Sequence, residues 1–192
     1  MWPWEHLAFA YVLYSLTTNV VFRRSPSAGE TIAIAVGSQF PDLLDKPLAW
    51  TIGITETGYS VGHSIFVAPF ICLAAYAVAA RLGNRTLASA FSVALVSHPI
   101  ADILNRVLRG EVVDPRIVLW PIASPPVGSQ SGFIDHFRRY FFRYVHHLLT
   151  DGLTPQVAFQ SLLGLSVVAI WLFDGAPVAA DLWRAWRDRS RQ

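Results

Sequence analysis

The sequence predicts an all-α fold: an integral membrane bundle of four to five apolar helices, with one amphipathic helix lying at the membrane surface. Hydrophobic residues make up 53% of the 192 residues and charged residues only 15%, which is too apolar for an ordinary soluble domain of this length. Apolar stretches of helical length recur along the chain, and short basic turns join several of them. We therefore treat residues 1–192 as a single membrane-embedded domain.

Four apolar stretches approach the roughly 20 residues that a helix needs to cross the hydrocarbon core. They are Leu7–Phe22, Val61–Ala80, Thr86–Leu104 and Val157–Phe173. A fifth stretch, Glu30–Phe40, has only 11 residues before Pro41. At about 1.5 Å per residue it reaches about half way across, so it is expected to be short, tilted, or continued past Pro41 by Leu43–Ile54.

Four connections join these stretches, namely Arg23–Gly29, Asp42–Ser60, Arg81–Arg85 and Asn105–Gln156. The long connection, 105–156, holds a proline-rich segment around Trp120 that cannot be helical. It also contains Phe133–Leu149, where apolar residues recur at helical spacing and charged residues occupy other faces. That pattern is typical of a helix lying in the interface plane. The tail from Trp183 onward is basic and amphipathic.

Charge and cysteine content exclude several classes of protein. A net charge of +2 is too small to indicate a nucleic-acid-binding surface, so no nucleic-acid partner is expected. The lone Cys72 allows neither an intrachain disulfide nor a cysteine-based zinc site. The first residues lack the basic start of a cleavable signal peptide, so the first apolar segment is expected to be retained.

Histidine and aspartate residues lie at corresponding ends of successive apolar stretches. They are His6, Asp42, Asp45, His63, His98 and Asp102. Because they alternate between the start of one stretch and the end of the next, an up-and-down bundle puts all six at one level of the membrane. The opposite ends carry arginines and, apart from Glu30, no histidine or acid. This arrangement predicts a metal site at one end of the bundle.

The spacing of His98 and Asp102 carries the strongest local signal. Residues at i and i+4 share a helix face, so the imidazole and the carboxylate can bind one ion or bridge two. The alternative is a hydrogen-bonded pair that stabilises the helix end. Ionisable groups inside membrane segments are costly and usually functional, which favours ligation.

The other candidates each have a structural alternative as well. Asp42 and Asp45 are separated by two residues, and either one would also serve as the N-cap of a following helix. His63 opens the third stretch and would otherwise be a satisfied polar residue at a helix interface. His6 would otherwise belong to an interfacial aromatic belt with the neighbouring tryptophans, with Glu5 acting in its place.

A second His-x-x-x-Asp, from His147 to Asp151, lies beside His146 in the long connection. His136 precedes it by close to three helical turns. We interpret these residues as the solvated face of the interfacial helix. The alternative is that one face of this helix lies over the metal site.

A set of motifs in order carries a family resemblance. They are His6, Gly37-Ser-Gln-Phe-Pro-Asp42 followed by Asp45, Gly62-His63-Ser64, Ser97-His98 with Asp102, and Leu119-Trp120-Pro121. The chain resembles, over roughly its first 125 residues, the membrane-bound metal-dependent hydrolases once classed as a domain of unknown function and in part described as LexA-regulated. That family is distantly similar to zinc-dependent phospholipase C.

The resemblance implies that His6, Asp42, His63, His98 and Asp102 are the metal ligands. The chain departs from the family where Tyr59-Ser-Val-Gly-His-Ser64 replaces an Arg followed by Thr-His-Ser. A basic residue that would meet a phosphate is therefore missing at that position.

These observations predict a membrane-bound metal-dependent hydrolase. Histidine and carboxylate ligands suit one or two divalent ions, zinc first, with manganese or iron as alternatives. Asp45 is expected to act as a general base or as a partner that orients a ligating histidine. The expected partners are membrane lipids and an amphiphilic, phospholipid-like substrate. The basic turns away from the site lean toward a protein of the cytoplasmic membrane whose site faces outward.

Two other functions would use the same residues: a transporter of metal ions or protons, and a non-catalytic scaffold stabilised by metal. A transport pathway needs polar residues through the full thickness of the membrane. Here the opposite helix ends are apolar apart from Ser15, Thr17, Thr18 and Asn19. A scaffold would have its metal fully saturated by protein ligands.

Overall fold

The computed structural model describes residues 1–127, 132–150 and 152–191. The described helices are α1 (Pro3–Val21), α2 (Ala28–Pro47), α3 (Ala68–Arg81), α4 (Arg85–Leu108), α5 (Phe133–Thr150), α6 (Pro155–Phe173) and α7 (Ala179–Arg189), with a π-helical turn, η1 (Leu48–Ile52), and a 3-10 turn, η2 (Pro115–Val118). No strand occurs in these residues, which confirms the all-α prediction.

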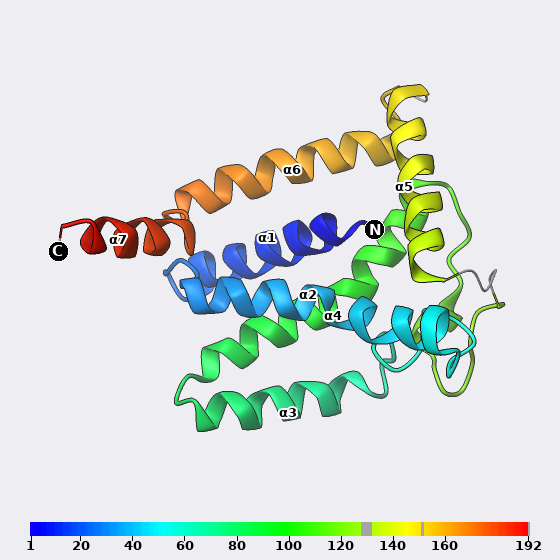
Figure 1. Cartoon of the computed structure of the whole chain (residues 1–192), viewed down its shortest axis with the longest axis horizontal. Helices are drawn as coiled ribbons and strands as arrows, with labels where there is room; N and C mark the ends of the chain where they lie inside the picture. The colour runs from blue at the N-terminus through cyan, green and yellow to red at the C-terminus, as the bar shows by residue number, and fades with distance from the viewer. Residues whose placement is uncertain (128–131, 151, 192) are drawn as a thin grey trace.

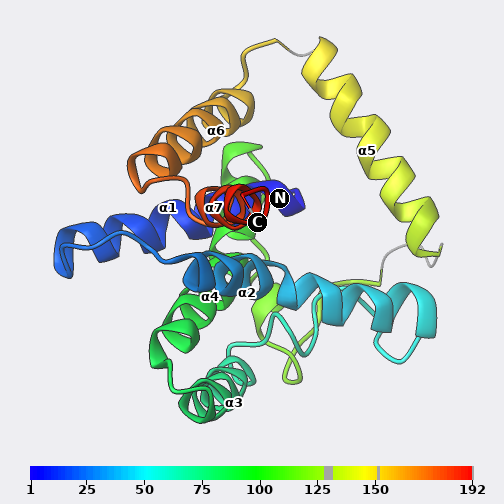
Figure 2. The ribbon, with the colours of Figure 1, turned by 60° about the vertical axis from the view of Figure 1, so that its left-hand side comes forward.

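Helix α4 lies at the centre of the bundle, where it packs against α1, α2 and α3, and α1 also packs against α2 and α6 (Figure 1 and Figure 2). Small side chains permit this close packing, because Ala90 and Ala94 of α4 meet Ile34 of α2 in the buried core. A Cβ added at Gly37 would lie 2.4 Å from the carbonyl oxygen of Phe91. Glycine therefore sets how closely α2 approaches α4.

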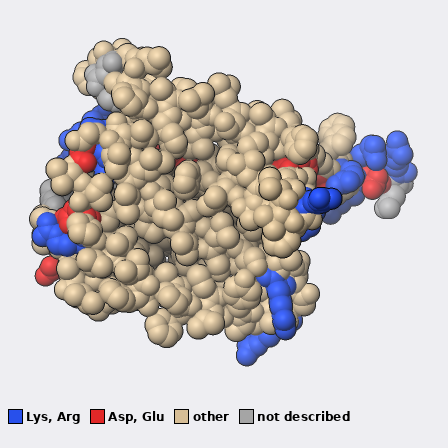
Figure 3. All heavy atoms as spheres, turned by 180° about the vertical axis from the view of Figure 1, so that it is seen from behind, with Lys and Arg blue, Asp and Glu red and all other residues tan. Residues whose placement is uncertain are grey.

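The outer faces of the bundle are apolar. Phe70 on α3 is 72% exposed and Leu165 on α6 is 71% exposed, and large exposed apolar residues also lie on α1, α2 and α4. Charged side chains on the face drawn in Figure 3 gather toward the two ends of the molecule. This distribution matches a surface in contact with lipid between two aqueous layers.

Two described helices, α4 and α6, are long and apolar enough to cross a membrane. Helix α3 is apolar but has 14 residues, which is about 21 Å. The expected four to five apolar spanning helices are therefore not confirmed by length and composition. Helix α5 occupies the stretch that was expected to form the amphipathic helix. It runs crosswise to α1 and α6 (Figure 1).

Helix α2 does not stop at Pro41. It continues through Pro41 and Pro47 into η1, so the connection to α3 begins near Gly53 instead of Asp42. Pro41 has no N–H to donate to the carbonyl four residues earlier. Its backbone packs closely against Gly62 in the loop between η1 and α3, where an added Cβ on Gly62 would lie 2.7 Å from the Cα of Pro41. Asp42 and Asp45 therefore lie inside α2, and the structural alternative in which either one is the N-cap of a following helix is wrong.

Helix α3 begins at Ala68, so the expectation that His63 opens this helix is wrong. Pro69 lies in the first turn of α3, where its missing N–H costs no helical hydrogen bond. His63 lies in a turn that precedes the helix. The amides of Ser60, Gly62 and His63 all donate to Asp45, and these bonds hold the turn in a non-helical conformation.

Candidate metal centre

The structure brings the six histidine and aspartate candidates together at one end of the bundle. His6 comes from α1, Asp42 and Asp45 from α2, His63 from the turn before α3, and His98 and Asp102 from α4. All six are buried, and Asp42, the most exposed, has only 8% of its surface accessible. Buried ionisable groups of this kind need partners or a bound ion.

The imidazole of His98 is oriented by the backbone of α2. Its Nδ1 lies 2.6 Å from the carbonyl oxygen of Ser38. Because a carbonyl only accepts hydrogen bonds, Nδ1 carries the proton and the lone pair is left on Nε2. The Nε2 atom has no hydrogen-bond partner among the described residues.

His63 is oriented in the same way by Asp45. Its Nδ1 lies 2.7 Å from Oδ2 of Asp45, which accepts the proton of the ring and leaves Nε2 unprotonated. This Nε2 is also buried without a hydrogen-bond partner in the described part of the chain. A ligating histidine whose other nitrogen donates to a carboxylate or carbonyl is the usual arrangement at a metal.

The two free nitrogens face two carboxylate oxygens. Nε2 of His63 and Nε2 of His98 each lie 3.6 Å from Oδ1 of Asp42. The same two nitrogens each lie 3.9 Å from Oδ2 of Asp102. Asp42, His63 and His98 form one group whose ligand atoms all lie within 4.8 Å of one another, and Asp102 lies beside it.

These separations are close to those that a zinc ion imposes. Tetrahedral ligands about 2.0–2.1 Å from zinc lie about 3.3 Å from one another. The nitrogens of His63 and His98 lie 3.6 Å from the oxygen of Asp42, close to this value, and 3.9 Å from the oxygen of Asp102, somewhat beyond it. His63, His98 and Asp42 therefore form a candidate site for a divalent metal ion, with Asp102 next to it.

His6 lies beside this group. Its ring stacks on His98 with centroids 3.6 Å apart, and its Nε2 lies 3.3 Å from Oδ1 of Asp102. His6, His98 and Asp102 form a second group whose ligand atoms lie within 4.8 Å of one another. Nδ1 of His98 is used by the Ser38 carbonyl, so both groups depend on the same Nε2 atom, and one nitrogen lone pair binds one ion. A second ion at this place would therefore have to share Asp102 with the first.

Asp45 is fully occupied by protein donors. Its two oxygens accept the amides of Ser60, Gly62 and His63 and the ring proton of His63. The side chain is completely buried. Of the two roles expected for Asp45, these contacts favour the one that orients a ligating histidine.

Several residues near the site were not among the candidates. Lys46 pairs with Oδ2 of Asp42, and the α-amino group of Met1 lies 2.6 Å from Oδ1 of Asp102. Arg106 stacks on Tyr59, 5.7 Å from the ring centroid. Lys46 and Arg106 each follow a site aspartate by four residues, so helical spacing was the signal that would have identified them.

Tyr59 lies in the loop between η1 and α3, with its ring centroid 4.8 Å from that of His63. The negative charge of Asp102, followed by burial, raises the pKa of the Tyr59 phenol. The phenol therefore stays protonated and remains a hydrogen-bond donor beside the site.

The second His-x-x-x-Asp, from His147 to Asp151, lies largely outside the described residues. Asp151 and the side chains of His136 and His147 lie outside the described residues. His146 is exposed on α5.

The opposite end of the bundle holds a second polar cluster around buried Glu30 and half-buried Asp174, and sequence reasoning missed part of it. Asp174 accepts hydrogen bonds from Tyr11, Ser15 and Asn19 of α1. Glu30 accepts from Tyr14 and pairs with Arg24. The polar residues noticed in α1 were the available signal, but their partner Asp174 lies far away in the sequence.

Fold and site together define an all-helical membrane protein with a buried histidine and aspartate cluster at one end of its bundle. The chain belongs to the YdjM inner membrane protein family, whose model matches residues 1–178. No curated protein and no solved structure matches it. The match confirms a membrane-protein family and agrees with the expected membrane location. It contains no statement about hydrolysis or about phospholipase C.

Proposed function

We propose that this protein is a membrane-bound metal-dependent hydrolase of an amphiphilic phosphoester. The observation that supports it best is the buried group of Asp42, His63 and His98, whose ligand atoms lie within 4.8 Å of one another, with Asp102 beside it and both histidine tautomers already set. When bound there, a divalent ion, zinc by preference, would supply Lewis acidity and an activated water. His6 would complete the ligand set, or serve a second ion.

The chain supplies positive charge for a phosphate at the same place. Arg106 lies over Tyr59 and has 28% of its side chain exposed, as does Lys46 beside Asp42. Guanidinium groups bind phosphate oxygens through paired hydrogen bonds. Arg106 would take the role of the basic residue that the family has before its Thr-His-Ser motif and this chain lacks.

We further propose that α1, α2, α3, α4 and α6 all enter the membrane and that α5 lies at its surface beside the site. Their exposed apolar faces support this, and so does the crosswise direction of α5. Trp2 packs against Phe137, Phe141 and Tyr144 of α5, with ring centroids 5.2–6.0 Å apart. A lipid-like substrate would thus approach the site beside an aromatic cluster at the level of the head groups.

Transport is the less favoured function because packed apolar residues separate the two polar ends. On α1, Ala10 lies between His6 and Tyr14, and it is completely buried. On α2, completely buried Ile34 lies between Ser38 and Glu30. An ion pathway would need polar groups through this layer.

Two measurements test the proposal. The metal content of the purified protein should be close to one or two ions per chain, and His98→Ala and Asp102→Ala should lose most of it. Hydrolysis of lipid-like phosphodiesters by wild type should disappear in the same variants. His146→Ala is the matched control, because this histidine is exposed on α5 and should change neither measurement.

The outcomes separate the competing functions. Full metal retention by both variants would exclude the proposed centre. Bound metal without hydrolysis of any phosphodiester would favour the scaffold, and metal flux into sealed vesicles would favour the transporter.

A further inference from the structure

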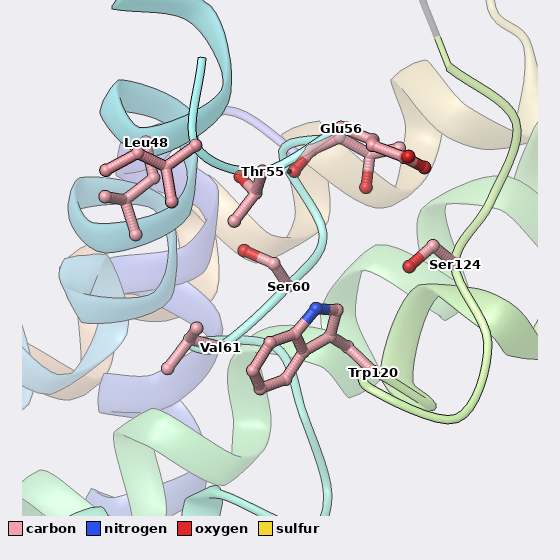
Figure 4. A pocket seen from close by; sticks show the side chains of 9 residues that line it. Leu48, Thr55, Glu56, Ser60, Val61, Trp120 and Ser124 are labelled. Carbon is pink, nitrogen blue, oxygen red and sulfur yellow. Dashed lines mark hydrogen bonds between the residues drawn. The ribbon is translucent and has the colours of Figure 1, made fainter. Parts of the chain in front are cut away.

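A cavity of about 290 Å³ lies between the loop that follows η1 and the segment around Trp120. Figure 4 shows Leu48, Thr55, Ser60 and Trp120 around this space. The segment 60–64 connects the cavity to the site. Ser60 and His63 donate their amides to Asp45, and Ser64 donates its hydroxyl to the carbonyl oxygen of Trp120 at 2.5 Å. A ligand in the cavity would therefore lie beside the segment that carries His63.

One wall of the cavity carries an unsatisfied polar group. Ser60 is only 2% exposed, and its Oγ has no hydrogen-bond partner within the described part of the chain. The hydroxyls of Thr55, Thr57 and Ser124 also line the space, and Trp120 adds an aromatic surface. A buried hydroxyl without a partner is unfavourable, so a ligand that satisfies Ser60 would be stabilised here.

The lining indicates which ligand chemistry fits. Glu56 is the one charged group among the described lining residues, and they include no lysine or arginine. A phosphate would therefore find no counter-charge in the cavity and is better served by the metal centre and Arg106. The Thr55 and Thr57 hydroxyls donate to backbone carbonyls and offer a ligand their oxygens as acceptors, whereas the Ser60 hydroxyl can both donate and accept. A ligand hydroxyl also donates and accepts, so a ligand with several hydroxyls matches this lining. An ammonium group only donates and would leave the proton of the Ser60 hydroxyl unpaired.

We propose that this cavity binds the neutral, polyhydroxylated head group of the substrate, a unit the size of glycerol or one sugar ring. The volume is at the lower end for small-molecule pockets and suits one such unit. The C–H face of the polyol would pack on Trp120, and its hydroxyls would pair with Ser60 and its neighbours. This assignment rests on the proposed hydrolase function, because it names the substrate class of that site.

Binding is tested without any need for turnover. The protein is placed in phosphatidylcholine nanodiscs, and saturation-transfer NMR is recorded with methyl β-D-glucopyranoside, glycerol and choline as separate probes. The glucoside and glycerol should receive saturation from wild type and choline should not. Ser60→Ala and Trp120→Ala should lower the polyol signals at least fivefold, while Trp183→Ala on exposed α7 should leave them unchanged. Metal content equal to wild type shows that the variants remain folded.

Hydrolysis then separates the two proposals. With p-nitrophenyl phosphodiesters of glycerol and of choline, Ser60→Ala should raise KM for the glycerol ester about tenfold and leave its kcat and the choline ester unchanged. Hydrolysis of both esters with no effect of Ser60→Ala would overturn the head-group site and leave the hydrolase intact. No hydrolysis by any form would overturn the hydrolase, and the NMR result would still decide what the cavity binds. Equal polyol signals in wild type and both variants, or saturation of choline alone, would overturn the polyol site.

Discussion

At the scale of single residues, the site depends on groups that fix imidazole orientation. The carbonyl oxygen of Ser38 holds His98, and the carboxylate of Asp45 holds His63. Both contacts leave the Nε2 lone pair free, which is the form that binds a metal. The spacing in the sequence indicated the aspartate, but the role of the Ser38 carbonyl could not be predicted, because every residue carries a carbonyl.

Asp45 is therefore expected to act through His63. Asp45→Asn keeps the size of the side chain but places at most one acceptor oxygen where two accepted four hydrogen bonds. We predict a 10- to 100-fold weaker metal affinity, the range typical for loss of a partner of a ligating histidine. Competition titration with a zinc chelator measures it.

Asp181→Asn is the control, because Asp181 lies on exposed α7 and should leave the affinity unchanged. A wild-type affinity in Asp45→Asn would contradict the orienting role.

At the scale of elements, contacts between distant parts of the chain decide where a helix continues and where it begins. The sequence left it open whether the stretch before Pro41 is short, tilted or continued past Pro41, and in the structure α2 continues through Pro41, with Gly62 packed against the Pro41 backbone. The apolar run from Val61 predicted a helix start, yet Asp45 holds this segment as a turn. In both cases the contacting partner lies 15 to 21 residues away in the chain, beyond the reach of a local sequence pattern.

The contact between α2 and α4 makes a prediction at this scale. Gly37→Ala forces a Cβ to within 2.4 Å of the carbonyl oxygen of Phe91, so the two helices must separate. We predict a loss of about 1–3 kcal/mol in stability, as for other overpacked sites. The midpoint of thermal unfolding in detergent should fall accordingly, and metal retention should weaken because α2 and α4 carry four of the six site residues.

The matched control is Gly164→Ala on α6. A Cβ there meets none of the described atoms within 4 Å, and alanine favours a helix over glycine by about 1 kcal/mol. This variant should be as stable as wild type or slightly more so. If both substitutions lowered the midpoint equally, close packing at Gly37 would not be the cause.

At the scale of the whole molecule, charge lies at the two ends of an apolar bundle. The end away from the site carries Arg81 and Arg85 at the α3–α4 turn and the arginines of α7. The site end carries Lys46, Arg106 and α5. The positive-inside rule counts charges in short loops close to helix ends, and on that basis we propose that the site faces outward.

Cysteine labelling tests this orientation. In a Cys72→Ser background, Val112→Cys, 90% exposed after α4, should react with a membrane-impermeant maleimide in intact spheroplasts. Arg187→Cys on α7 should react only after lysis, because the membrane shields it from the reagent. The reverse pattern would place the site on the cytoplasmic side.

The sequence by itself determined the all-α class, the membrane character and the set of residues that meet at one end. Composition and the alternation of site residues between helix starts and helix ends carry that information, because antiparallel packing turns regular spacing into a common level. Only the tertiary structure decided that Asp45 orients His63, that Asp174 anchors α6 to α1, and that the loop after η1 encloses a cavity with Trp120. These features depend on contacts between groups far apart in the chain, whose distances and hydrogen bonds no local pattern encodes.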